Sequence, residues 1–367
     1  MESQRETKKC PFCGRELTAE NTIIFDETAM CRSCLGEQTV ICADCGNRTW
    51  SESSYEVNGT LVCEHCYDDY YICSECGRVV YRDDAYFDDN DNAYCYTCHE
   101  RLSDRAIKEY SYKPEPVLYG SGSLYLGVEL EIDNGGEADS NADILLNTAN
   151  MNDERIYCKH DGSIDCGFEI VSHPMSLDYH MNTMNWKEIF DKAVSMGYRS
   201  HQTSTCGLHC HVSRLGFSIL SEIQEAVIAR IVYFVENHWN ELLKFSRRTE
   251  ANMNRWASRY GITGNTQSTY KNAKDKHMGR YVAVNLENDD TIEFRLFRGT
   301  LRYETFIATL QLVDEICRVC IRLSDEELER LSWGDFVLQI HDKPELIDYL
   351  KSKRLYVNEI TPSEEDM

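Results

Sequence analysis

The sequence predicts an α+β protein, in which an antiparallel sheet carries helices packed on one face and small metal-stabilised β-hairpin modules precede it. Three observations support this prediction. Twelve of the 18 cysteines fall within the first 98 residues, all in Cys-x2-Cys pairs. After residue 123, strand-like and helix-like segments alternate. Several strand-like segments carry polar side chains at positions i and i+2, which share one face of a strand.

The net charge and the hydropathy of the sequence disfavour nonspecific nucleic-acid-binding proteins and membrane proteins. Lys and Arg total 38 against 62 for Asp and Glu, a formal net charge of −24, which disfavours nonspecific nucleic-acid binding. No apolar run approaches the length of a membrane span, and MESQRETKK has no signal-peptide core, so we expect a cytoplasmic protein with no membrane partner. A group of arginines would suit a small anionic ligand: Arg247, Arg248, Arg255 and Arg259.

The cysteine spacing predicts three tandem zinc modules of the zinc-ribbon or half-LIM type. Gaps of 17, 17 and 18 residues inside the modules alternate with gaps of 7 and 6 between them. Four thiolates close a tetrahedron, so we expect three structural Zn²⁺ ions per chain. Pairing within each module is the first expectation, and pairing across the short gaps is the alternative. The ligands would be Cys10, Cys13, Cys31, Cys34, Cys42, Cys45, Cys63, Cys66, Cys73, Cys76, Cys95 and Cys98.

The composition also suggests the domain organisation. Residues 1–110 would hold the zinc modules, with a short helix in LSDRAIKEY, and their acidic, tyrosine-rich sequence suits a protein or peptide partner. The prolines and Gly/Ser run of residues 111–123 predict a linker. Residues 124–323 would form the catalytic domain, and 324–367 a helical extension with a disordered acidic tail. Strands are expected at 124–132, 155–160, 167–172, 208–214, 280–287 and 291–298, and helices at 177–197, 218–247, 302–323 and 344–352.

Acidic side chains recur on the first strands of this domain. Glu129 and Glu131 alternate with apolar residues, and two carboxylates on one strand face repel each other unless a cation lies between them. Glu169 is a further carboxylate on a strand. Lys159 precedes an Asp-Gly turn and could neutralise a phosphate or a substrate carboxylate.

Histidines and arginines complete the pattern. His209 and His211 share a face of the strand GLHCHVS and favour a metal ligand beside a phosphate contact. Glu293 and Arg295 share a face of TIEFRLFR. Buried arginines beside acids require a polyanionic ligand, and a triphosphate with Mg²⁺ satisfies both. A fourth zinc site at Cys206 and Cys210 fits no zinc spacing.

The order LGVELEID, KHDGS, GFEIVSHP, CGLHCHVS and IEFRLFRGTL resembles the glutamine synthetase and glutamate–cysteine ligase superfamily of carboxylate–amine ligases. It looks most like the amidoligase family within it, over residues 124–323. The resemblance implies a glutamine synthetase-like fold, ATP as cosubstrate, and Mg²⁺ held by Glu129, Glu131, Glu169, His209 and Glu293. It further implies a nucleotide near His211, Ser213 and Arg295, and phosphate stabilisation by Arg280, Arg295 and Arg298. Lys159 has no secure counterpart in glutamine synthetase and is expected to be catalytic from its own position before the Asp-Gly turn.

The function that the resemblance implies is ATP-dependent formation of an amide bond through an acyl-phosphate. The substrates would be amino acids, peptides or proteins that supply a carboxylate and an amine. Two alternatives are a guanidino-type phosphotransferase of related fold, and a non-enzymatic zinc-module adaptor with a relict ligase domain.

Overall fold

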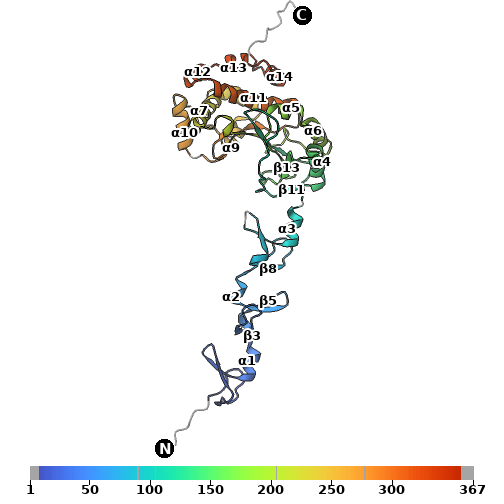
Figure 1. Ribbon diagram of the computed structural model, residues 1–367, viewed down its shortest axis with the longest axis vertical. Coiled ribbons are helices and arrows are strands. Elements are labelled where there is room, and N and C mark those ends of the chain that lie inside the picture. Colours follow the sequence, from blue (N-terminus) through green and yellow to red (C-terminus); the bar gives the residue numbers. More distant parts are fainter. Residues whose placement is uncertain (1–7, 89–90, 104, 204, 277, 357–367) are drawn as a thin grey trace, which may run out of the picture. The chain divides into compact units, whose positions relative to one another are not determined.

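A computed structural model describes residues 8–88, 91–103, 105–203, 205–276 and 278–356. The chain divides into two compact units, Met1–Asp104 and Arg105–Met367 (Figure 1). The acidic tail predicted to be disordered lies outside the described residues. Among the residues that are described, none of the helices combines the length and hydropathy needed to cross a membrane.

The first unit consists of three cysteine-rich modules, each built on two-stranded antiparallel hairpins. A hairpin leads into the third cysteine of every module, as the sequence predicts. The first module contains β1 (Thr22–Phe25), β2 (Thr28–Cys31) and α1 (Arg32–Gln38). The second contains β3 (Thr39–Ile41), β4 (Arg48–Trp50), η1 (Ser51–Ser53), β5 (Ser54–Val57), β6 (Thr60–Cys63) and α2 (Glu64–Tyr67). The third contains β7 (Tyr70–Ile72), β8 (Val79–Tyr81), η2 (Arg82–Asp84), β9 (Ala85–Phe87), β10 (Ala93–Cys95) and α3 (Tyr96–Ser103).

Each module has a very small hydrophobic core. In the second module, Val57 and Val62 are the buried aliphatic residues of a cluster that also contains Cys42. A core of this size does not stabilise a fold by itself, so the cysteines must contribute the stability.

The second unit is built on a seven-stranded sheet in the order β11-β13-β14-β12-β15-β17-β16. All neighbouring strands are antiparallel except β11 and β13, which are parallel. The prediction of an antiparallel sheet is therefore confirmed for all strand pairs of this sheet except β11 and β13. The strands are β11 (Ile107–Lys108), β12 (Leu126–Ile132), β13 (Ile156–Lys159), β14 (Phe168–Ser172), β15 (Gly207–Ser213), β16 (Val284–Asn285) and β17 (Thr291–Arg298).

Helices and one face of the sheet enclose a single hydrophobic core. Val128 and Leu130 of β12 contribute to this core together with residues of α4, α6, α7 and α11. Helix α11 packs against α7, α14 and α5 (Figure 1). The helices are α4 (Asp139–Asn150), α5 (Leu177–Asn182), α6 (Trp186–Ser195), η3 (Arg214–Gly216), α7 (Ser221–Asn237), α8 (Trp239–Ser246), α9 (Glu250–Trp256), α10 (Thr266–Asp275), α11 (Tyr303–Arg322), α12 (Asp325–Arg330), α13 (Trp333–Leu338) and α14 (Pro344–Ser352).

In the described part of the second unit, two predicted helices are interrupted, and five other α-helices were not predicted. The segment 218–247 divides into α7 and α8 at His238, which is buried and packs between Phe234 and Trp333. The segment 177–197 divides into α5 and α6. Both breaks redirect the chain toward tertiary contacts, which the local apolar period does not encode. The five helices between predicted elements are α4, α9, α10, α12 and α13.

The boundary between the units precedes the predicted linker. Residues 111–123 lie in the second unit, where the backbone N–H of Val117 donates to His173 Nδ1 at 3.1 Å. The backbone N–H of Tyr119 donates to the carbonyl of Pro174. In the segment LSDRAIKEY, α3 ends at Ser103 and residues 107–108 form β11, so the predicted short helix covers only its beginning.

Candidate metal and active sites

The twelve N-terminal cysteines gather into three groups of four. Within each group the sulfur atoms lie within 4.8 Å of one another, and each group comes from one module. Pairing within modules, the first expectation, is therefore the observed arrangement. Gly14, Gly46 and Gly77 have φ values of +69°, +71° and +72°, which explains why glycine follows the second cysteine.

The sulfur atoms of each group need a cation. Burial opposes ionisation of Cys10, but backbone N–H groups of Cys31, Cys13 and Phe12 lower its pKa to about 6. The neighbouring sulfur of Cys13 and burial raise the pKa of Cys34 well above its usual range. The four sulfurs therefore cannot all be thiolates without a compensating charge. A tetrahedral Zn²⁺ ion fits this donor set.

The strand register of the second unit places the predicted acidic and histidine residues on one face of the sheet. Glu131 pairs with Glu169 across β12 and β14, and Glu129 pairs with His209 across β12 and β15. Paired residues of an antiparallel ladder project to the same side. The apolar residues between them face the core, so this side is called the polar face. Its predicted members are Lys159, Glu169, Glu129, Glu131, His209, His211, Ser213, Glu293, Arg295 and Arg298.

An irregularity between β15 and β17 changes which residues of β17 reach the polar face. Glu293 pairs with His211, but the register shifts between Leu208 and Cys210. Arg298 consequently pairs with Gly207 and joins Glu293 on the polar face, although the two differ by an odd number of residues. The alternation of a regular strand would have turned Arg298 into the core.

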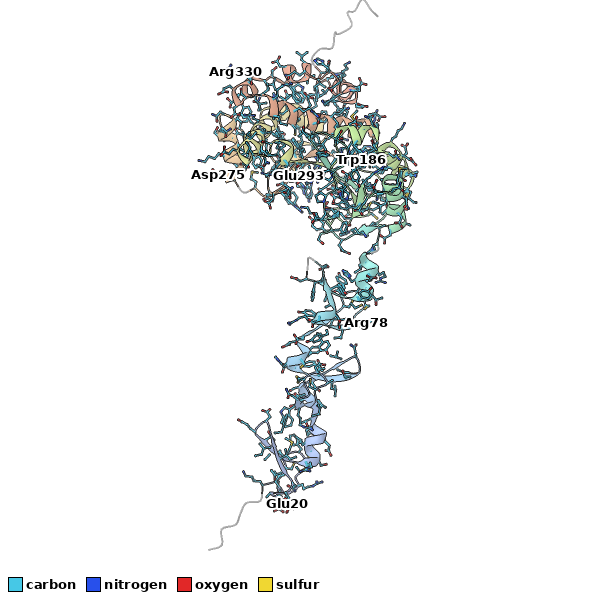
Figure 2. The ribbon with its side chains drawn as sticks, viewed as in Figure 1. Glu20, Arg78, Trp186, Asp275, Glu293 and Arg330 are labelled. Carbon is cyan, nitrogen blue, oxygen red and sulfur yellow. The ribbon has the colours of Figure 1, made fainter. Side chains whose placement is uncertain are left out.

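Glu129 lies at the centre of the polar face. Its two carboxylate oxygens lie 3.3 Å from His209 Nδ1 and 3.2 Å from His211 Nε2. Glu293 Oε1 lies 3.6 Å from His209 Nδ1. Two sets of possible metal ligands share Glu129: one adds Glu169 and His209, and the other adds His211 and Glu293. In each set the ligand atoms lie within 4.8 Å of one another. Figure 2 labels Glu293 inside the second unit.

Three carboxylates of the polar face, Glu131, Glu169 and Glu293, are buried, Glu129 is partly buried, and these like charges repel one another. Burial and the charge of Glu129 raise the pKa of Glu169 well above its usual range, against the effect of Lys159. Burial also raises the pKa of Glu131. Burial opposes ionisation of Glu129, but the charge of His211 and hydrogen bonds with both histidines hold its pKa well below its usual range. A divalent cation would relieve this repulsion, and carboxylate oxygens are the ligands Mg²⁺ prefers.

Two predicted residues of this face have partners within the protein. The backbone N–H of Gly207 donates to Glu131 Oε2 at 2.5 Å, which ties one oxygen of this carboxylate to β15. Lys159 Nζ lies 3.3 Å from Glu169 Oε2. Lys159 therefore already offsets part of the carboxylate charge at the β13 end of the face.

The predicted arginines occupy three different surroundings. Arg295 donates to Glu293. Arg298 Nη2 donates to the carbonyl of Thr203 at 3.2 Å. Arg280 precedes β16, is exposed, and donates to the hydroxyls of Tyr110 at 2.6 Å and Tyr281 at 3.2 Å. The expected strand 280–287 is only two residues long, so Arg280 does not join the polar face.

Ser213 and His211 lie at the opposite end of β15 from Gly207. Ser213 pairs with Thr291, and His211 Nδ1 lies 3.3 Å from Thr291 Oγ1. This end of the polar face is where the sequence resemblance expects the nucleotide.

Two further residues of the site were not assigned from the sequence motifs. Asn285 of β16 is buried, pairs with Glu293, and donates to Glu293 Oε2 at 2.8 Å. Arg248 follows α8 and donates from Nη2 to the carbonyl of Phe297 at 3.1 Å. Arg248 belonged to the arginine group seen in the sequence, but only the fold brings it to the end of β17.

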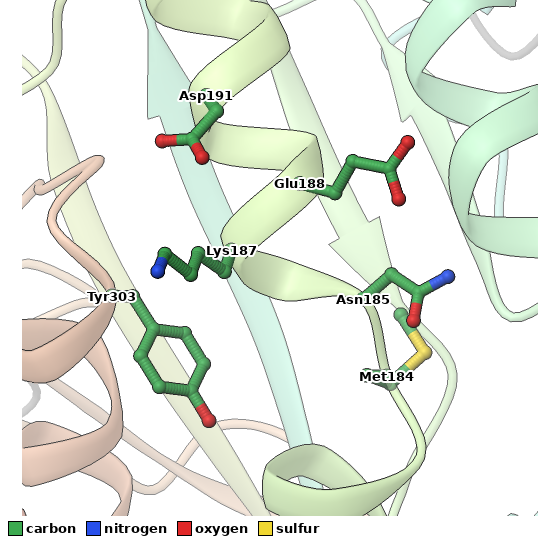
Figure 3. Close-up of a pocket in the computed structure, with 6 residues that line it drawn as sticks. All are labelled: Met184, Asn185, Lys187, Glu188, Asp191 and Tyr303. Atoms are coloured by element: carbon green, nitrogen blue, oxygen red, sulfur yellow. The ribbon is translucent and has the colours of Figure 1, made fainter.

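A hollow on the surface shares no residue with the polar face. Met184, Asn185, Lys187, Glu188 and Asp191 come from α6 and the turn before it, and Tyr303 comes from α11 (Figure 3). Lys192 of the same helix pairs with Glu188 at 2.9 Å. We assign this hollow no role, because it lacks the converging ligand atoms of the polar face.

The second unit is thus a mixed α/β fold whose sheet presents buried carboxylates, imidazoles and guanidinium groups on one face. Residues 142–317 match the family described as "Putative amidoligase enzyme". The match runs from α4 into α11, so it includes Glu169, His209, His211 and Glu293, while Glu129 and Glu131 precede it.

Comparison with solved structures gives a weaker likeness. A bifunctional glutathione synthetase from Pasteurella multocida is similar with a TM-score of 0.34 and 12% identity, over 63% of this chain and 46% of that protein. This chain therefore covers less than half of that protein, and we base no conclusion on the likeness. Comparison with curated proteins gives no match.

Proposed function

We propose that this protein is an ATP- and Mg²⁺-dependent carboxylate–amine ligase that forms an amide bond. The match of residues 142–317 to the amidoligase family supports a ligase in general terms. The observation that carries the finer assignment is the position of Glu129, which is shared by two sets of metal ligands on the polar face. Two adjoining cation sites suit a nucleoside triphosphate, whose phosphate oxygens need neutralisation on more than one side.

In this proposal the carboxylates and histidines hold the cations. Glu129, Glu169 and His209 would form one site, and Glu129, His211 and Glu293 the other. Bound Mg²⁺ would neutralise the phosphate oxygens of ATP and orient the terminal phosphoryl group. Asn285 and Arg295 keep the Glu293 carboxylate in place through hydrogen bonds.

The basic residues bind and orient the reacting anions. Arg295 and Arg298 reach the polar face at its β17 side, where they can stabilise phosphoryl oxygens. Lys159 would neutralise the substrate carboxylate or the phosphate at the β13 side. Arg280 is not on the sheet, but its partners Tyr110 and Tyr281 lie against Lys159 and Arg295, so its expected role in phosphate binding stays a prediction.

In this proposal the reaction proceeds in two steps. A substrate carboxylate oxygen attacks the terminal phosphorus of ATP, the bond to the bridging oxygen breaks, and ADP leaves. The neutral amine then attacks the carbonyl carbon of the acyl-phosphate. Phosphate leaves with the electrons of the C–O bond, and the amine nitrogen loses a proton. The protein contributes positioning and charge neutralisation.

The zinc modules have a separate role in this proposal. Three Zn²⁺ ions stabilise the first unit, whose exposed aromatic residues include Tyr55 and Tyr96. These modules would recruit a protein or peptide that supplies one of the two reacting groups. The substrate would then be an amino acid, a peptide or a protein carrying a carboxylate or an amine.

Product analysis tests the proposal. Purified full-length protein would be incubated with ATP, Mg²⁺ and pools of amino acids, peptides and cell extract, while phosphate release and new condensation products are followed by mass spectrometry. We expect a pool-dependent product with the mass of an amide, lost in Glu129→Gln. Glu304→Gln is the control, because Glu304 is an exposed carboxylate that pairs with Arg302. Equal turnover by Glu129→Gln would contradict the proposal, and a phosphorylated acceptor without amide would favour a phosphotransferase.

A further inference from the structure

Three arginines meet where α8 ends and β17 ends. They are Arg247, Arg248 and Arg298, here called the arginine cluster. Arg247 has a φ of +65°, in the left-handed region, and terminates α8. This turn directs two successive arginines toward the last residues of β17. A non-glycine residue in this conformation is strained, so the surrounding contacts must hold it.

The arginine cluster donates its observed hydrogen bonds to backbone carbonyls. Arg247 donates to the carbonyls of Arg298 and Gly299, and Arg248 donates to that of Phe297. Arg298 donates to the carbonyl of Thr203. Within the described residues, none of the three forms an ion pair with a carboxylate.

Other arginines of the same unit are paired. Arg230 lies 2.7 Å from Asp325, and Arg259 lies 3.0 Å from Glu236. The arginine cluster therefore differs from the structural arginines of this fold. Carbonyl oxygens orient its guanidinium groups without neutralising them.

The three arginines are partly buried, which makes the lack of a direct ion pair costly. Burial lowers the pKa of Arg248 to about 10, with Glu131 acting in the opposite direction and the neighbouring arginines adding to the effect. Burial also lowers the pKa of Arg247. The Nε atoms of Arg248 and Arg295 are buried and, among the described residues, have no hydrogen-bond partner. Positive charge and free donors of this kind favour an anion.

The arginine cluster adjoins the metal-ligand groups through Gly207. A Cβ atom on Gly207 would lie 2.7 Å from His209 Nε2 and 2.8 Å from Arg248 Nη2. These two groups therefore approach each other in the space that the glycine leaves. His209 Nδ1 faces Glu129 and Glu293 on its other side. His209 thus stands between the carboxylates and the arginine cluster.

We propose that the arginine cluster is an oxyanion subsite, which binds a phosphate or carboxylate group of a ligand lying beside the metal-ligand carboxylates. The identification of this oxyanion as a phosphoryl group, or as an anchoring carboxylate of the acyl substrate, rests on the proposed function. The binding of an anion by the cluster does not rest on that function. Planar guanidinium groups bind both kinds of oxyanion through paired hydrogen bonds.

The test measures anion binding without nucleotide or added Mg²⁺. The thermal stability of full-length protein would be followed while inorganic phosphate or succinate replaces chloride at constant ionic strength. We expect a saturable rise in Tm with at least one of the two anions. In Arg248→Gln and in Arg298→Gln the Kd should rise by at least about tenfold, which corresponds to about 1.4 kcal/mol. Arg302→Gln is the control, because Arg302 is exposed and outside the cluster.

Comparing phosphate with succinate identifies the kind of oxyanion that binds. The Arg248→Lys variant separates the loss of paired donors from a failure to fold. Stabilisation by phosphate identifies a phosphoryl subsite, and stabilisation by succinate identifies a carboxylate subsite. Arg248→Lys keeps the charge but not the paired donors, so it should bind more weakly than the wild type even if Arg248→Gln fails to fold. Absence of saturable stabilisation in the wild type, or wild-type affinity in Arg248→Lys and Arg298→Gln, would overturn the proposal. Failure to find an amide product would leave this result unaffected.

Discussion

Glu129 and His209 lie opposite each other on β12 and β15, with Glu129 Oε2 3.3 Å from His209 Nδ1. Both side chains are on the polar face, and the second oxygen of Glu129 faces His211 at 3.2 Å. One carboxylate therefore joins two imidazoles that a single strand presents at i and i+2. This arrangement makes Glu129 the residue on which the proposed metal sites depend most.

Glu129→Gln should weaken Mg²⁺ binding. The substitution keeps the size of the side chain but removes the negative charge shared by both ligand sets. We expect the Kd for Mg²⁺ to rise at least about tenfold, since even residues outside a metal's direct ligands typically cost 10–100-fold. Calorimetric titration of Mg²⁺ measures this effect. Unchanged affinity would show that the polar face is not the magnesium site, and Glu304→Gln should retain wild-type affinity.

Zinc analysis should give three ions per chain. Each module supplies four sulfur ligands, so Cys42→Ser should lower the content to two and destabilise the second module. Cys206→Ser, in the second unit, is the matched control and should leave three ions. Three ions in a chain that lacks residues 1–110 would contradict the assignment. Elemental analysis by mass spectrometry provides the count.

Gly207→Ala should disturb both parts of the site. The added Cβ would lie 2.7 Å from His209 Nε2 and 2.8 Å from Arg248 Nη2, so at least one of these groups must move. Weaker binding of both Mg²⁺ and the oxyanion is the expected result. Gly127→Ala is the control on the neighbouring strand, because its nearest contact would be an ordinary 3.5 Å to His211. Equal effects of the two substitutions would contradict the close approach of His209 and Arg248 to Gly207.

The buried His180 should make the second unit less stable in acid. Trp186 Nε1 donates to His180 Nδ1 at 3.1 Å, so His180 Nε2 carries the proton and donates to the carbonyl of Leu126. Burial lowers the pKa of His180 from 6.5 to about 4. Between these values the unfolded chain binds the additional proton, so the free energy of unfolding falls as the pH falls.

His180→Gln removes this titration and provides the measurement. The stability of the wild type relative to the variant should decrease by about 2 kcal/mol between pH 7 and pH 5. Denaturant unfolding followed by tryptophan fluorescence reports on the second unit, which contains Trp186, Trp239, Trp256 and Trp333. A relative stability that does not change with pH would show that His180 is accessible to protons in the folded state.

Local sequence patterns predicted much of the site because strand alternation is a local property. The i and i+2 positions of Glu129 and Glu131, and of His209 and His211, were sufficient to place each pair on one face. The cysteine spacing likewise predicted the grouping within each module. In both cases neighbours in the sequence are also neighbours in the site.

Residues positioned by irregular or long-range structure were harder to predict. The register shift between β15 and β17 brings Arg298 to the polar face. The helix break at His238 and the turn at Arg247 bring Arg248 to the end of β17. Arg280 was expected on a strand, but the strand begins at Val284. Asn285 lies only eight residues before Glu293, but its role depends on the register of this hairpin, which the sequence pattern did not provide.

The most direct test of the account follows oxygen from the substrate into phosphate. A carboxylate substrate, or a pool of them, would be labelled with heavy oxygen and incubated with ATP, Mg²⁺, an amine pool and the full-length protein. Transfer of one labelled oxygen to each released phosphate, together with an amide product, is the predicted result, and Glu129→Gln should abolish both. Phosphate that takes its new oxygen from water alone, with no amide formed, would contradict the account.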